Sequence, residues 1–253
     1  MHASLPMYAL PALAPAHQRL WAAIRIHLAQ AGIPSPEHLN QEGAGLRFWR
    51  APDLLFSQTC GLPYRAHLHT QVNLIGTPDY GLPGTPPGYY HSVLIKNRKD
   101  TRTELAAFGA ATVAINDPGS QSGFAALVEA SQIASVTFGE IRVTGAHAAS
   151  VRAIAEGTAD LAAIDAVTWQ LLCTHHRVDD QVTAFAITRP TPGLPFICAR
   201  QFDPDVLFDA VAAAIEGLEP NDRAALMLKG LVRISDSTYR AEPVPDATAL
   251  DGS

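Results

Sequence analysis

The sequence predicts an α/β protein with two lobes. From residue 111 onward, apolar runs of strand length alternate with segments whose apolar residues recur at helical spacing. Two passages rich in glycine and proline, at residues 76–88 and 189–195, bracket this regular block. A chain of 253 residues is also long enough to form two cores. We therefore expect each lobe to be a mostly parallel sheet flanked by helices, because strands that alternate with helices favour that arrangement.

The amino-terminal part is expected to begin the first lobe. Residues 4–9 have the pattern of a short strand, and Pro15 can start a helix directly after it. The buried side of this helix should consist of Leu20, Trp21, Ile24 and Leu28. Residues 53–56 and 71–75 are predicted as further strands. This β-α opening places the first residues inside the folded lobe.

The regular block is expected to form the second lobe. Its predicted strands are 89–95, 111–116, 140–144, 161–164 and 182–187, and its helices begin near Ser122, His147 and Val167. The chain then crosses between the lobes twice, so residues 89–195 form the second lobe and residues 1–88 with 196–253 form the first. Residues 204–230 are predicted helical, and the tail after Tyr239 is expected to fray.

Residues 116–123, which read N-D-P-G-S-Q-S-G, join a strand to a helix at the centre of this block. Ser120 or Ser122 can cap the first helical turn, and the glycines allow close approach of a ligand to the backbone. Unpaired N–H groups and the positive end of the helix dipole would then meet a small anion. The alternative interpretation is an ordinary helix cap without a ligand.

The carboxyl ends of three strands should lie at the same edge of the sheet, where ligands bind in α/β proteins. Asn116 ends the first of these strands and His147 follows the second. An imidazole such as that of His147 can donate a hydrogen bond to an oxyanion. His147 is also the group in these loops that could become cationic near neutral pH, because they contain no lysine or arginine. Asp165 ends the third strand and either accepts a ligand proton or simply caps the next helix.

Ser57, Gln58 and Thr59 are the candidates for a binding loop on the first lobe, since they follow a buried strand. An ordinary surface loop is the alternative. Tyr90 lies at the first crossover, where it could wall a binding cleft or pack inside a strand. Cys60 could serve as a nucleophile, but the sequence around it supplies no base.

Composition excludes several classes of function. A net charge of -6 with no basic run argues against nucleic acid as a partner. No apolar run is long enough for insertion into a membrane. The three cysteines form no C-x-x-C pair. Two pairs of histidines, His67 with His69 and His175 with His176, lack a third and fourth ligand, so no metal site is predicted. Without a phosphate loop or a G-x-G-x-x-G run, no cofactor is predicted.

The order of three motifs resembles the phosphate and phosphonate solute-binding proteins of ABC importers. These motifs are N-D-P-G-S-Q-S-G at 116–123, T-G-A-H at 144–147 and A-I-A-E-G-T-A-D-L-A-A-I-D at 153–165. The resemblance implies the type 2 periplasmic-binding-protein fold, with two lobes and two hinge crossovers. It also implies that the phosphoryl group is bound by Ser120, Gln121, Ser122, Gly123 and His147. Gln121 departs from the family pattern, which has a hydroxyl residue there.

The function that the resemblance implies is closure on a small phosphate-like oxyanion, with an ABC permease as partner and no catalysis. A cytosolic ligand sensor, or an enzyme that uses the same scaffold on a small phosphorylated metabolite, is the alternative. The first residues lack the charged start and apolar core of an export signal, so a cytoplasmic location is expected. We also expect the protein to be a monomer.

Overall fold

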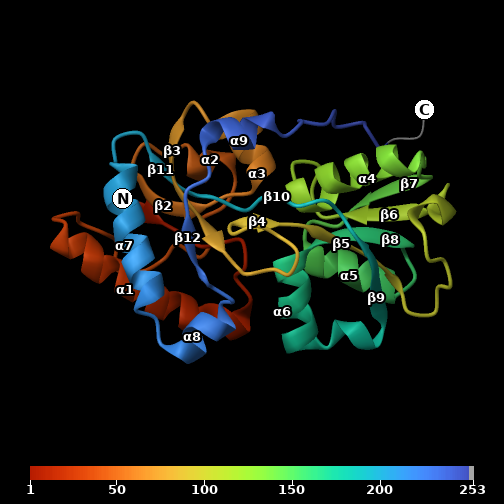
Figure 1. Ribbon diagram of the computed structural model, residues 1–253, viewed down its shortest axis with the longest axis horizontal. Coiled ribbons are helices and arrows are strands. Elements are labelled where there is room, and N and C mark those ends of the chain that lie inside the picture. Colours follow the sequence, from red (N-terminus) through yellow and green to blue (C-terminus); the bar gives the residue numbers. More distant parts are fainter. Residues whose placement is uncertain (251–253) are drawn as a thin grey trace. The chain divides into compact units, whose positions relative to one another are not determined.

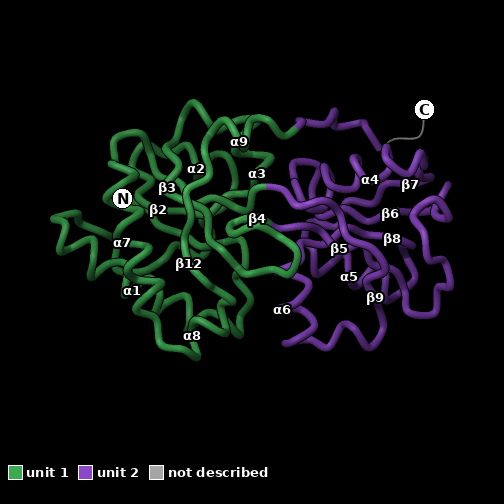
Figure 2. The backbone as a smooth tube through the Cα atoms, in the orientation of Figure 1, with its two compact units in different colours: residues 1–89, 192–242 green, residues 90–191, 243–253 purple. Residues whose placement is uncertain are grey.

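The computed structural model of the protein describes residues 1–250. The chain divides into two compact units, shown in Figure 1 and coloured separately in Figure 2. Unit 1 contains residues 1–89 and 192–242, and unit 2 contains residues 90–191 and the described residues from Pro243 onward. The chain passes from the first unit to the second at β4 (Tyr89–Tyr90) and returns at β10 (Thr191–Pro192), and these two strands pair with each other.

The sheet of unit 1 has the strand order β1-β2-β11-β3-β12. Its strands are β1 (His2–Ala3), β2 (Leu54–Gln58), β3 (Val72–Asp79), β11 (Phe196–Ala199) and β12 (Gly230–Val232). β1 is parallel to β2, whereas β11 is antiparallel to both of its neighbours and β12 is antiparallel to β3. The sheet is therefore mixed, because strands that enter after the return crossover run against those that precede it.

Two long helices, α1 (Ala14–Gln30) and α7 (Pro204–Glu216), pack against each other in unit 1, and α7 also contacts β3 and β12. The apolar side predicted for α1 is confirmed, since Leu20, Trp21, Ile24 and Leu28 are all buried. The short helical segments of the unit are η1 (Pro11–Leu13), α2 (Leu46–Trp49), α3 (Gly61–Pro63), η2 (Tyr64–Leu68), α8 (Pro220–Ala225) and α9 (Asp236–Ala241).

The sheet of unit 2 has the strand order β7-β6-β8-β5-β9. Its strands are β5 (Ser92–Asn97), β6 (Thr112–Ile115), β7 (Glu140–Val143), β8 (Leu161–Asp165) and β9 (Val182–Ile187). β6 is parallel to β7 and β8, while β5 is antiparallel to β8 and β9. The carboxyl ends of β6, β7 and β8 consequently meet at one edge of the sheet.

The helices of unit 2 are η3 (Leu105–Phe108), η4 (Gln121–Ala125), α4 (Ala126–Ala134), α5 (His147–Ala155), α6 (Ala166–His176) and η5 (Val178–Asp180). α5 packs across β5, β6, β8 and β9, and α6 contacts β5 and β8. Figure 1 shows α4 above the strands of this unit and α5 below them. Helices thus cover the sheet, as the alternating pattern predicts.

Several boundaries differ from those predicted. The strand expected at residues 4–9 is wrong: the strand is β1, and Pro6 has no N–H to donate to a ladder. β3 continues to Asp79, into the passage predicted as a loop. β12 begins at Gly230, the last residue of the segment predicted as helical. α9 extends to Ala241, into the tail expected to fray. The tail from Pro243 groups with unit 2 instead of the first lobe, and its Leu250 is buried.

Candidate functional site

The helix start after β6 is shaped by the Ser120 side chain. Ser120 has an extended backbone, and its Oγ accepts a hydrogen bond of 3.0 Å from the N–H of Gly123. Its carbonyl oxygen accepts from both Phe124 and Ala125, so η4 opens as a π-helical turn before α4 continues it. π-helical turns are frequent at functional sites. The cap satisfies one of the first-turn N–H groups, which have no acceptor within a helix.

Asn116 lies against the same turn from the end of β6. A Cβ atom added to Gly123 would lie 1.8 Å from Asn116 Oδ1, so a glycine is required for this approach. The Oδ1 atom is buried and has no hydrogen-bond partner among the described residues. Asn116 and Gly123 therefore form one packed unit at the helix start.

His147 is the first residue of α5 and reaches the same turn. Its Nε2 atom lies 2.8 Å from Ser122 Oγ. The loop that precedes it is fastened to the end of β6, because the N–H groups of Thr144 and Gly145 donate to the carbonyls of Ile115 and Asn116 at 2.9 Å each. The structure thus brings together the two motifs that are 25 residues apart in the sequence.

The third strand end joins this edge through β5. Ser92 pairs with Asp165 in the sheet, and its hydroxyl donates to the Ser122 carbonyl at 2.9 Å. Asp165 is buried, and its Oδ1 accepts from the N–H of Thr168 at 2.8 Å, so it caps α6. Sequence reasoning missed Ser92, although a serine that opens the apolar run S-V-L-I was a usable signal.

The electrostatics of the site differ from the expectation for His147. Burial lowers the pKa of its imidazole from 6.5 to about 4, so the ring is neutral near pH 7. The loops at 116–123, 144–147 and 165–168 contain no lysine or arginine. The edge therefore presents neutral hydroxyl and N–H donors together with the helix dipole, which suits an anion without a buried cation.

The remaining predicted residues of this unit lie beside these groups in the chain. Gln121 is the first residue of η4 and is 5% exposed. Tyr90 belongs to β4 and is 2% exposed. Both side chains are buried polar groups, in contrast to the exposed Asp117 within the same loop as Gln121.

Ser57, Gln58 and Thr59 belong to unit 1, and their placement differs from the predicted outward-facing loop. Ser57 and Gln58 lie inside β2, and all three residues are buried. The Ser57 hydroxyl lies 2.7 Å from Ser4 Oγ and accepts from Trp49 Nε1 at 3.2 Å. Gln58 Nε2 donates to the Leu194 carbonyl at 3.1 Å, and the Thr59 N–H donates to that of Pro195. The Ser57 side chain thus serves the core of this unit.

Within residues 1–250, no group of three or more histidine, cysteine or acidic residues is placed to hold a metal ion. No helix among these residues has the length and apolar character needed to cross a membrane.

The sequence matches a family model over residues 55–239, and the family is described as the periplasmic substrate-binding protein of phosphonate ABC transporters. No curated protein matches the sequence. Among solved structures, PhnD1 from Prochlorococcus marinus in complex with methylphosphonate superposes with a TM-score of 0.70 at 13% identity, covering 95% of this chain and 94% of that one.

A binding protein component of an ABC phosphonate transporter from Pseudomonas aeruginosa gives a TM-score of 0.66 at 16% identity, with coverage of 94% and 82%. XAC2383 from Xanthomonas citri bound to ATP gives 0.67 at 13% identity, with coverage of 94% and 93%. These likenesses confirm the type 2 periplasmic-binding-protein fold.

The family match confirms the resemblance drawn from the three motifs, and the family consists of binding proteins and not of enzymes. It also overturns one expectation. The cytoplasmic location is wrong, because the family is periplasmic. That expectation rested on the first residues of the sequence alone, and those residues do not decide where the protein acts.

Proposed function

Because the chain belongs to the family of periplasmic substrate-binding proteins of phosphonate ABC transporters, we propose that its second unit binds the phosphonate or phosphate group of a small ligand. The ligand is then delivered to an ABC permease. One observation carries this proposal: Ser120 and Ser122 lie at the start of η4, and Ser122 is held by His147 at 2.8 Å. Phosphoryl oxygens fit such a helix start, because its N–H groups and dipole favour negative charge.

The proposed ligand contacts come from the residues at this edge of unit 2. They are Tyr90, Asn116, Ser120, Gln121, Ser122, Gly123 and Asp165, and His147 adjoins them through its contact with Ser122. The methylphosphonate bound to PhnD1 supports a phosphonate as the first ligand to test. Phosphate has the same tetrahedral phosphorus, with an oxygen in place of the carbon substituent, so it is the natural competitor.

The two crossovers are proposed to act as a hinge. The chain passes between the units at β4 and β10, and short paired strands can absorb a small rotation. Small-angle scattering with and without methylphosphonate tests this, since closure reduces the radius of gyration. The same measurement gives the molecular mass and so tests the prediction of a monomer.

A thermal-shift titration with methylphosphonate, phosphate and sulfate tests the binding function. A ligand that binds only the folded state increases the free energy of unfolding by RT ln(1 + [L]/Kd), and this increase raises the Tm. Ser122→Ala should weaken the response to methylphosphonate or phosphate. Ser131→Ala is the matched control, because this buried serine of α4 bonds to the Val128 carbonyl about three turns away from the helix start.

Two results would contradict the proposal. The first is a Tm that none of the three anions raises. The second is a Ser131→Ala variant that loses as much of the response as Ser122→Ala, since the effect would then not come from the helix start.

A further inference from the structure

The contact between His147 and Ser122 carries an inference that rests on the proposed function and deepens it. We propose that His147 is a positioning residue: its Nε2–H donates to the Ser122 hydroxyl, which in turn donates its own proton to an oxygen of the ligand. His147 then determines affinity without touching the ligand. This role differs from the direct contact with phosphoryl oxygens that the family resemblance implies for the histidine.

The first step concerns the two ring nitrogens. Nε2 is engaged by Ser122 Oγ at 2.8 Å. Nδ1 is buried and has no hydrogen-bond partner among the described residues. An N–H group already directed at Ser122 has no second hydrogen for a ligand. A buried Nδ1 cannot reach one either.

The second step fixes the tautomer. A proton on Nδ1 would bury an N–H donor without an acceptor, which is costly and rare in proteins. A proton on Nε2 leaves only an unused lone pair on Nδ1 and satisfies the donor at Ser122. An imidazolium would again bury the Nδ1–H, and burial holds the pKa of this ring at about 4. The neutral ring protonated on Nε2 is therefore the form that fits.

The third step concerns the hydroxyl of Ser122. It has one proton, and its lone pairs accept from His147, so the proton points elsewhere. Ser120 Oγ lies at 3.4 Å, a long contact, and that atom already accepts from the N–H of Gly123. The backbone of Ser122 is held as well, because Ser92 Oγ donates to its carbonyl at 2.9 Å. A charged ligand oxygen would offer the Ser122 proton a shorter and stronger bond.

The fourth step is the energetic consequence. Without His147, the Ser122 hydroxyl is free to rotate, so binding must first fix its orientation. The affinity lost on removal of His147 should therefore result entirely from the freed Ser122 hydroxyl. In a variant that already lacks the hydroxyl, removal of His147 should change the affinity for the ligand little.

A double-mutant cycle measured by calorimetry against methylphosphonate and inorganic phosphate tests this coupling. Ser122→Ala and His147→Ala should each weaken binding, by roughly 10- to 100-fold for Ser122→Ala. The double variant should bind no more weakly than Ser122→Ala alone. His147→Gln should recover part of the affinity, because its amide can donate to Ser122. His176→Gln, an exposed histidine of the same unit, is the control. Effects that multiply in the double variant would overturn the proposal.

The tautomer is tested separately in the ligand-free protein by NMR with ¹⁵N-labelled histidine. The His147 signals, assigned by their loss in His147→Gln, should show a proton on Nε2 and none on Nδ1 near neutral pH. A proton on Nδ1 or on both nitrogens would overturn the proposal. If neither probe anion binds the wild-type protein, the proposed function fails, but this spectrum still decides whether His147 donates to Ser122.

Discussion

The side-chain oxygen Oδ1 of Asn116 lies 1.8 Å from the point where a Cβ atom of residue 123 would be. The oxygen occupies the space beside the Gly123 backbone and is itself buried. No side chain can be added at residue 123 unless Asn116 moves. The helix start and the end of β6 are therefore matched in shape as well as linked by the chain.

We expect Gly123→Ala to destabilise the protein by about 1–3 kcal/mol, the usual cost of forcing an extra methyl group into a packed site. Alanine has the better helix propensity, by up to about 1 kcal/mol, so this overlap has to outweigh a gain. Urea unfolding measures the difference. Asn116→Ala in the same chain should recover stability, because it removes the obstructing oxygen.

The control for Gly123→Ala is Gly230→Ala, since a Cβ atom at Gly230 meets nothing within 4 Å. A Gly123→Ala variant as stable as wild type would mean that Asn116 swings away at no cost. The close fit between the two residues would then not matter for folding.

Ser57→Ala should lower stability and leave the affinity for anions unchanged. Its hydroxyl is bonded to Ser4 and Trp49 inside unit 1, and the substitution leaves the buried Trp49 N–H without its acceptor and the Ser4 oxygen without its donor. The expected cost is about 1–3 kcal/mol of unfolding free energy. Ser237→Ala is the control, because this serine is exposed. Calorimetry on the same variants would contradict the interpretation if Ser57→Ala mainly weakened binding.

The pH dependence of stability should carry the signature of His147. Its pKa falls from 6.5 to about 4 on folding, so the unfolded chain takes up a proton first as the pH drops. The free energy of unfolding is therefore unaffected by this histidine above pH 6.5 and decreases as the pH falls from about 6.5 to 4. The total decrease is about 3 kcal/mol at most, from 1.36 kcal/mol per pKa unit.

The difference between the unfolding free energies at pH 7 and pH 5 should accordingly be smaller in His147→Gln than in wild type. His17 has the same lowered pKa of about 4 in unit 1, so the remaining slope should shrink further in His17→Gln. An unchanged slope in both variants would show that these rings are not the source of the acid sensitivity. His176→Gln provides the exposed comparison.

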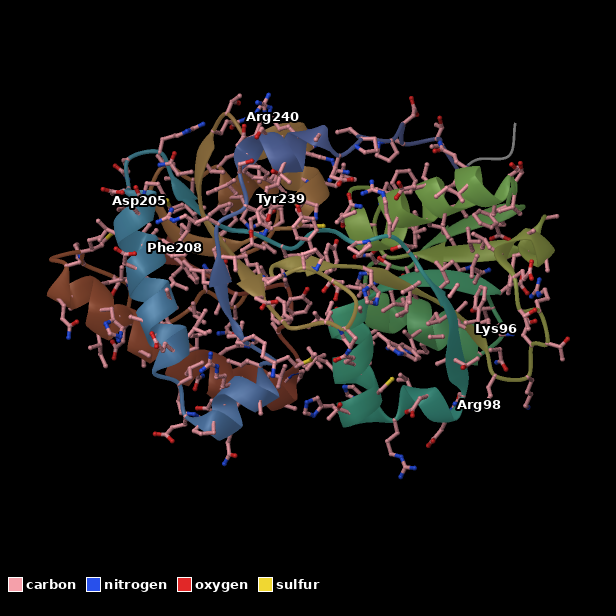
Figure 3. All side chains as sticks on the ribbon, viewed as in Figure 1. Lys96, Arg98, Asp205, Phe208, Tyr239 and Arg240 are labelled. Carbon is pink, nitrogen blue, oxygen red and sulfur yellow. The ribbon has the colours of Figure 1, made fainter. Side chains whose placement is uncertain are left out.

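Tyr239→Phe tests the support of the return crossover. Tyr239 belongs to α9 and is labelled in Figure 3. Its hydroxyl donates to the Gly193 carbonyl at 2.8 Å and lies 2.7 Å from Thr77 Oγ1. Both partners are buried, so removal of the hydroxyl should cost about 1–3 kcal/mol. Differential scanning calorimetry gives the shift in Tm.

Tyr64→Phe is the matched comparison, because its hydroxyl bonds to Asp236, whose side chain is 42% exposed. Water can replace that bond, so the loss should be smaller than for Tyr239→Phe. Equal losses for the two variants would contradict the importance of the buried pair.

What the sequence predicted well depends on neighbours in the chain. The apolar spacing of Leu20, Trp21, Ile24 and Leu28 determines a helix face locally, and the Ser120 cap needs only a partner three residues away. The motif order then brought the His147 loop to the same edge. The first two signals lie within a few residues of the structure that they predict, whereas the third spans 25 residues and came from the order of the motifs.

What the sequence did not show depends on distant partners. The inward orientation of Ser57 follows from Ser4, 53 residues earlier, and an isolated run S-Q-T looks like an exposed loop. β12 has only three residues and exists because β3 pairs with it. The neutral state of His147 follows from burial, which no local pattern reveals.

The position of β11 has a consequence for the order in which the protein can fold during synthesis. β11 lies between β2 and β3, yet it is translated more than a hundred residues after both of them. The five strands of unit 2 are made in the interval, within residues 92–187. The second unit can thus complete its sheet while β2 and β3 still lack the strand that joins them. Between these two moments the nascent chain carries three unpaired strand edges, one of β2 and both of β3, because β12 is also made later. These edges are open to association with other chains or to chaperones.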